Sequence, residues 1–210
     1  EKGIYMRQFS IAVLSAVLLS TVSVSAQADT LLGLYAGVDG IVNTGESNNV
    51  SADNDVVGSY YLAFEHPVPF LPNAKVRYTQ LDQSSKAKAL DAIGYFEILD
   101  NVVSVDVGLG AKRFIESNSD ATTIPALYAS AGGKLPFTGL SAKAEAFVGK
   151  GTDADFSDIN AEIKYNFIEN LAIDLGLKAG YRIMTVNVDD SGSGNDFKVK
   201  GPYLGLEAHF

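Results

Sequence analysis

The side chains that could do chemistry in this chain are carboxylates, amines and guanidinium groups. Cysteine is absent, and the two histidines are His66 and His209. Without cysteine the chain has no thiolate nucleophile and no disulfide framework. Both histidines lie at the ends of predicted strands, which favours hydrogen bonding in turns or at an interface over acid, base or nucleophilic catalysis. We therefore expect no catalytic residue.

Three polar segments carry pairs of acids that could bind a cation. These pairs are Asp53 and Asp55, Asp153 and Asp155, and Asp189 and Asp190. Carboxylate oxygens are ligands that Ca²⁺ prefers, but none of the three segments has the spacing of an EF-hand. We interpret them as solvated acidic loops, and we expect neither a metal site nor a bound cofactor.

Many of the other charges lie in segments where apolar and polar residues alternate. In residues 103–112 the odd positions hold Val, Val, Val, Leu and Ala, and the even positions hold Ser, Asp, Gly, Gly and Lys. A period of two places successive side chains on opposite faces of a strand. Residues 140–148, 158–165 and 173–182 repeat this pattern, so their charges share one face and their apolar residues the other.

This period predicts ten strands, with eight as the alternative count. They are expected at residues 31–42, 56–66, 74–82, 88–99, 102–115, 122–135, 140–150, 156–167, 171–187 and 197–210. Short connections at 67–73, 100–101, 136–139 and 168–170 alternate with polar ones at 43–55, 82–87, 116–121, 151–155 and 189–196. The alternation predicts an all-β protein, a transmembrane up-and-down antiparallel β-barrel with short periplasmic turns and longer extracellular loops.

In such a barrel the charged face lines a lumen. Alternation places acids there at Glu65, Asp91, Glu97, Asp106, Glu145, Asp158, Glu162, Asp174 and Glu207. It places bases there at Lys75, Arg77, Lys112, Lys143, Lys164, Lys178 and Arg182. Unpaired charges in a narrow interior are costly, so we expect a paired network that closes the lumen.

We assign this luminal charge network to nine residues. They are Asp106, Lys112, Lys143, Glu145, Glu162, Lys164, Asp174, Lys178 and Arg182. Three bases among them, Lys112, Lys178 and Arg182, are expected to pair with neighbouring acids. The acids considered are Asp106, Asp174 and Glu162.

The first 28 residues have the features of an export signal. Met6 and Arg7 supply a positive start, residues 11–19 are apolar or small, and the sequence Ala-Gln-Ala at 26–28 fits the small residues that signal peptidase requires. We expect cleavage after Ala28. Residues 1–28 then comprise a signal peptide and the residues upstream of it. Residues 29–210 are expected to form a single barrel domain in the outer membrane of a Gram-negative bacterium.

The end of the chain supports the same compartment. Apolar residues alternate with others up to an aromatic terminus, at Leu204, Leu206, Ala208 and Phe210. A terminal strand that closes in Phe resembles the assembly signal of outer-membrane barrels. These four residues are therefore expected to be recognised by the barrel assembly machinery.

Several segments resemble a family of small outer-membrane β-barrel proteins of Gram-negative bacteria. The segments are AFEHPVPFLPN at 63–73, YFEILDN at 95–101, LPFTGL at 135–140 and GPYLG at 201–205. The family carries no assigned activity, so the resemblance implies fold and location but no substrate. This chain departs from the family pattern in lacking tryptophan, which leaves its interfacial belt to Tyr and Phe.

The sequence favours a non-enzymatic outer-membrane barrel with a closed lumen and acidic external loops. The net charge of −9 argues against a nucleic-acid partner. Expected partners are outer-membrane lipid and lipopolysaccharide, and the protein is expected to be a monomer. One alternative is a narrow channel for ions or small solutes, which would leave charge of one sign in excess along a path. Another is an outer-membrane hydrolase, but no constellation for it is found at the extracellular rim.

Overall fold

Every segment with a period of two forms a β-strand in the computed structural model. The structure describes residues 32–44, 46–47, 50–51, 55–68, 70–82, 86–116, 121–152, 154–170, 173–188 and 197–210. The expected signal peptide at 1–28 lies outside the described residues, as do the acids Asp53, Asp153, Asp189 and Asp190. No helix long and apolar enough to cross a bilayer occurs in these described ranges.

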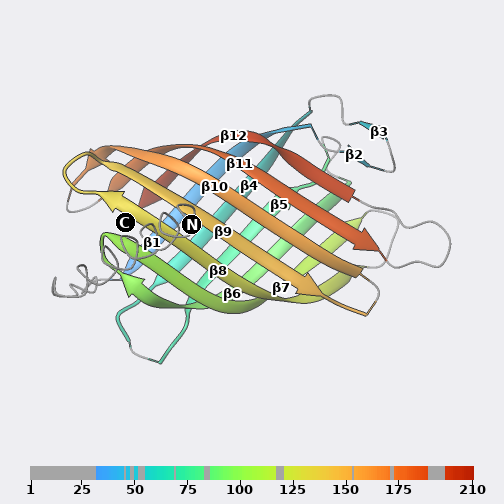
Figure 1. Ribbon diagram of the computed structural model, residues 1–210, viewed down its shortest axis with the longest axis horizontal. Coiled ribbons are helices and arrows are strands. Elements are labelled where there is room, and N and C mark those ends of the chain that lie inside the picture. Colours follow the sequence, from blue (N-terminus) through green and yellow to red (C-terminus); the bar gives the residue numbers. More distant parts are fainter. Residues whose placement is uncertain are drawn as a thin grey trace, which may run out of the picture.

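Ten long strands make up the wall of the molecule (Figure 1). They are β1 (Gly33–Asn43), β4 (Asp55–Glu65), β5 (Asn73–Gln80), β6 (Ala87–Asp100), β7 (Val103–Glu116), β8 (Thr122–Leu135), β9 (Leu140–Lys150), β10 (Ala154–Glu169), β11 (Asp174–Val188) and β12 (Phe197–His209). The bounds of β8 and β9 coincide with the predicted ranges, and the others differ by one to three residues at an end.

All neighbouring strands are antiparallel, and the sheet closes on itself. The order runs β1-β4-β5-β6-β7-β8-β9-β10-β11-β12, and β12 pairs with β1 from Ile41↔Tyr203 to Tyr35↔His209. Two short strands, β2 (Glu46–Ser47) and β3 (Val50–Ser51), join β12 through the pair Phe197↔Ser47. The sequence analysis did not predict these two strands. The closed ten-strand barrel confirms the predicted fold class.

The connections gather at two ends of the barrel. We call one end the turn end, where β1, β5, β7, β9 and β11 begin and where β4, β6, β8, β10 and β12 end. We call the other the loop end, where β4, β6, β8, β10 and β12 begin and where β1, β5, β7, β9 and β11 end. In Figure 1 the turn end lies on the left and the loop end on the right.

Exposure alternates along the strands as the period of two requires. In β7, Leu109 is 67% exposed on the outer face, whereas Lys112 is fully buried on the inner face. The alternation is interrupted near the turn end by β-bulges between Glu97 and Leu99 and between Asn166 and Ile168. A bulge adds a residue to one strand and bends it.

Candidate functional site in the lumen

A single carboxylate, that of Asp158 on β10, joins three cations in the middle of the lumen. Its oxygens accept hydrogen bonds from Arg77 Nη2 at 3.1 Å, Lys112 Nζ at 2.8 Å and Arg182 Nη2 at 2.7 Å. Arg77 lies on β5, which is equally far from β10 in both directions around the closed sheet. The contact between Arg77 and Asp158 therefore crosses the whole lumen.

A row of alternating charge flanks this centre on the β5–β7 wall. Arg77 is directly opposite Asp91, and Asp91 is directly opposite Lys112. The ion pairs are 2.8 Å from Arg77 Nε to Asp91 and 2.8 Å from Lys112 Nζ to Asp91. All three side chains are buried. Buried charges of this kind are tolerated only when they are paired, and each here has an opposite charge in contact.

Glu145 on β9 makes the second contact across the lumen. It accepts from Lys75 Nζ at 2.5 Å, from Arg77 Nη1 at 2.7 Å and from the Tyr128 hydroxyl at 2.9 Å. Both cations come from β5, on a distant part of the wall. Asp158 and Glu145 together therefore hold Arg77 at the centre of the barrel.

Luminal glycines let side chains from strands two apart meet over the strand between them. Lys178 on β11, Gly205 on β12 and Asp39 on β1 lie in one row. Lys178 Nζ reaches Asp39 at 2.8 Å, and a Cβ atom at Gly205 would overlap the Asp39 carboxylate. Gly180 gives the same room to the Tyr203 hydroxyl, which donates to Glu162.

Two more contacts follow this arrangement nearer the turn end. Lys164 Nζ lies 2.5 Å from Glu207, and a Cβ atom at Gly176 would press on the Lys164 side chain. Tyr61 also donates to Glu207, past Gly37. Each of these glycines faces inward. A longer side chain from a neighbouring strand occupies the space that a side chain at the glycine would take.

The structure brings most of the nine predicted network residues into contact with charge. Lys112, Glu145, Lys164, Lys178 and Arg182 lie in the ion pairs above, and Glu162 lies 3.6 Å from Lys178. Lys143 is a looser partner, 3.8 Å from Asp106. Asp174 is separate from the others and lies 3.6 Å from His209 at the turn end.

The predicted partners were wrong for Lys112 and Arg182. Neither pairs with Asp106 or Asp174: Lys112 binds Asp91 and Asp158, and Arg182 binds Asp158. Asp106 lies on the same strand as Lys112, six residues away, which is about 20 Å along an extended chain. Alternation indicates which face a side chain occupies but not its depth. Of the three predicted bases, Lys178 does contact a predicted acid, Glu162.

The sequence analysis missed Asp39 and the tyrosines that bind luminal carboxylates. Asp39 is the partner of Lys178, and the alternation of residues 33–43 could have placed it inside. Tyrosine hydroxyls donate to four acids of the lumen. These pairs are Tyr61 with Glu207, Tyr95 with Glu65, Tyr128 with Glu145 and Tyr203 with Glu162.

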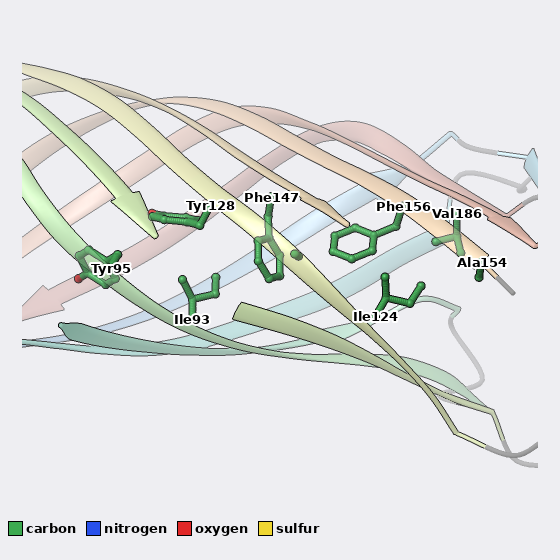
Figure 2. Close-up of a cluster of buried hydrophobic side chains, with 9 residues drawn as sticks. Ile93, Tyr95, Ile124, Tyr128, Phe147, Ala154, Phe156 and Val186 are labelled. Carbon is green, nitrogen blue, oxygen red and sulfur yellow. The ribbon is translucent and has the colours of Figure 1, made fainter. Parts of the chain in front are cut away.

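The interior also contains two clusters of buried apolar side chains. One buried cluster, shown in Figure 2, contains Ile93, Tyr95, Ile124, Ala126, Tyr128, Phe147, Ala154, Phe156 and Val186. A second contains Ile41, Val57, Leu81, Ala89, Met184, Val199 and Tyr203. Phe114 packs against both clusters. Ile124, Phe156 and Met184 of these clusters lie toward the loop end, whereas Tyr95, Tyr128 and Tyr203 also line the cavity described next. The sequence analysis did not predict these apolar clusters.

Toward the turn end the interior opens into a cavity of about 390 Å³. Its lining runs from Phe137 in a turn inward to Arg77 and Arg182 of the ion-pair network. Carboxylates, lysines and tyrosines line most of it, including Glu65 and Glu97. Within the described part of the chain, no group of three His, Cys, Asp or Glu side chains is arranged to hold a metal ion.

The four residues of the predicted assembly signal lie on or beside the last strand. Leu204 and Leu206 are exposed on the outer face of β12, at 65% and 50%, and Ala208 is half-buried. Phe210 is exposed, and its backbone exchanges hydrogen bonds with Leu34 of β1 at 2.9 and 3.2 Å. The last residue therefore extends the pairing that closes the barrel.

The two histidines contact their surroundings at the turn end. His66 Nδ1 accepts from the Val68 amide at 3.2 Å, and Nε2 lies 3.3 Å from the Pro72 carbonyl oxygen. His209 stacks on Tyr35 with ring centres 4.2 Å apart. His66 thus connects the two sides of the 66–72 turn.

Comparison with known proteins gives little information about this chain. No protein-family model matches the chain, and no curated protein matches it. Among solved structures, it is similar to the siderophore receptor PirA from Pseudomonas aeruginosa, with a TM-score of 0.32 and 14% identity. The alignment covers 87% of this chain but 36% of the receptor. A likeness of this size gives no functional information.

Proposed function

We propose that the chain is an integral outer-membrane β-barrel protein of a Gram-negative bacterium. Its outward face supports this, because large apolar side chains are exposed on many of the strands, including Leu62, Leu109, Leu127, Ile163, Leu177 and Leu204. An apolar surface of this extent is unfavourable in water and suits the acyl chains of a bilayer. A closed sheet also pairs its backbone polar groups internally, as a spanning structure must.

The barrel's function in this proposal is non-enzymatic, and its lumen is closed to ions. The observation that carries it is the bridge from Arg77 to Asp158 across the lumen, at 3.1 Å. Apolar side chains such as Ile124, Phe156 and Met184 then pack toward the loop end, where an ion would lose its water next to apolar groups. A narrow channel, the main alternative, needs a continuous hydrated path through both regions.

Location and partners follow from the sequence features. The signal peptide would be cleaved after Ala28, and the terminal segment from Leu204 to Phe210 would be recognised by the assembly machinery. The short motifs shared with small outer-membrane barrels support the same location. The acidic external loops would meet lipopolysaccharide, with divalent cations bridging the carboxylates to its phosphates, and the protein would be a monomer.

Fractionation of cells that express the full chain tests the location. We expect the protein in the outer-membrane fraction, with an intact mass that begins at Asp29. Recovery in the inner membrane, or a membrane-inserted form that retains residues upstream of Ala28, would contradict the proposal.

A further inference from the structure

The cavity at the turn end has the form of a small-molecule pocket that is closed at its inner end. Its volume of about 390 Å³ lies within the range of ligand pockets. At its inner end the lining reaches Arg77 and Arg182, which the carboxylates of Asp158 and Glu145 hold in place. A ligand would therefore enter and leave at the turn end.

The lumen itself shows how this protein binds an ammonium group. Lys178 Nζ lies 2.8 Å from Asp39 and 4.6 Å from the centre of the Tyr61 ring. Lys75 Nζ lies 2.5 Å from Glu145 and 5.0 Å from the same ring. A carboxylate together with an aromatic face provides a charged hydrogen bond and a cation–π contact.

One wall of the cavity repeats this combination of carboxylate and tyrosine. The Tyr95 hydroxyl donates to Glu65 at 2.6 Å, and the Tyr95 ring lies 5.7 Å from that of Tyr128. Glu97 follows Tyr95 by two residues on the same face of β6. Among the described residues, no lysine, arginine or histidine forms an ion pair with Glu65 or Glu97.

The charge of this wall favours a cation. Lys143 is one of the bases that face it, and its Nζ lies 3.8 Å from Asp106 with 39% of the side chain exposed. Over the whole lining of the cavity, ten Asp and Glu side chains stand against seven Lys and Arg side chains, an excess of three acids. Tyrosine rings lie beside these acids and can contact the carbon atoms of an organic cation.

We propose that the turn-end cavity binds a small aliphatic amine in its protonated form. Glu65 and Glu97 accept hydrogen bonds from the ammonium group, and the faces of Tyr95 and Tyr128 contact its carbon chain. The site goes beyond the closed-barrel proposal and does not depend on the membrane, because every residue that it uses faces the lumen.

Titration calorimetry on the refolded barrel in detergent tests the proposal, with putrescine as the probe. We expect putrescine to bind, and butanediol and succinate, which are similar in length but neutral or anionic, not to bind. Glu65→Gln and Glu97→Gln should each weaken putrescine binding about tenfold, since each removes one charged hydrogen bond. Glu116→Gln at the loop end should bind as the unaltered protein does.

Three results would overturn this site: no heat of binding with putrescine, binding of succinate as tight as that of putrescine, or glutamine variants that both bind putrescine as tightly as the unaltered protein does. Glu97 is exposed, so its variant keeps the test decisive if Glu65→Gln fails to fold. None of these results bears on whether the barrel conducts ions, which a separate measurement decides.

Discussion

Asp158 is the residue on which the luminal contacts converge. Its two oxygens bind two arginines and a lysine, and the residue is 3% exposed. Loss of one partner from a buried ion pair is more damaging than absence of the pair, because it leaves the other charges without compensation. Among the described residues Arg182 forms an ion pair with Asp158 alone, whereas Arg77 and Lys112 also bind Asp91.

Asp158→Asn should therefore destabilise the barrel strongly. The change removes the negative charge but keeps the size of the side chain, so Arg77, Lys112 and Arg182 lose their common partner. We expect a loss of about 3–5 kcal/mol in the free energy of unfolding. Urea titration of the barrel in lipid vesicles, followed by gel mobility without boiling, measures it.

The matched control for that change is Asp155→Asn. Asp155 lies on the same strand near the loop end, where it binds Asn187 at 2.7 Å in an exposed position. Its loss should cost less than about 1 kcal/mol. Equal stability of the two variants would mean that the buried ion pairs do not hold the barrel together.

At the scale of the strand, inward glycines decide which side chains can meet. A methyl group at Gly205 would overlap Asp39 and the Val38 carbonyl oxygen, and would push Asp39 away from Lys178. Gly205→Ala should cost about 1–3 kcal/mol of stability by overpacking. Thermal unfolding of the refolded barrel measures the change.

Gly40→Ala is the control within the neighbouring strand. A methyl group there would meet Val56 Cγ1 at 3.8 Å and the Leu204 carbonyl oxygen at 3.9 Å, which are ordinary contacts. The midpoint of thermal unfolding of this variant should stay close to that of the unaltered barrel. A similar loss of stability in both variants would show that replacing glycine changes the backbone conformation, and that overlap with luminal side chains is not the cause.

Two turns at the turn end each present a fully exposed aromatic side chain. Phe70 and Phe137 are 96% and 107% exposed, and both have positive φ angles of 68° and 64°. Such a backbone is uncommon for a residue with a bulky side chain. Aromatic side chains at this position suit the interface between lipid and water.

Phe137→Trp should therefore place a fluorophore in the membrane interface. The chain has no other tryptophan, so the signal is unambiguous. We expect quenching by lipids that are brominated close to the headgroup. Tyr35→Trp, which faces the lumen at the same end, should be quenched far less. The reverse order would place the 136–139 turn outside the lipid.

The strands were predictable from the sequence because a period of two is a local property of each strand. Leu140–Lys150 and Thr122–Leu135 begin and end where the alternation does. The partners of Lys112 and Arg182 were not predictable, because contacts across the lumen depend on how the strands are staggered around the closed sheet. The apolar clusters were missed for a related reason. Phe147 and Phe156 occupy inward positions of their strands, as the charged residues do, but they lie at a different depth in the barrel.

The whole molecule has three regions along its axis. A polar cavity occupies the turn end, a network of paired charges crosses the middle, and apolar side chains such as Ile124, Phe156 and Met184 pack toward the loop end. An ion that enters the cavity meets Arg77 and Arg182 already paired with carboxylates, and then apolar side chains. The bridge from Arg77 to Asp158 therefore lies between the cavity and the loop end, although charged side chains line much of the interior.

Conductance of the refolded protein in a planar bilayer tests this closed lumen most directly. A cysteine introduced at Thr152, in a chain that has no other cysteine, allows a fluorescent label to count the inserted barrels. We expect labelled barrels in the bilayer with no steady ohmic current above that of the lipid alone. A large ohmic conductance that rises with the number of inserted barrels would contradict the account and favour a channel.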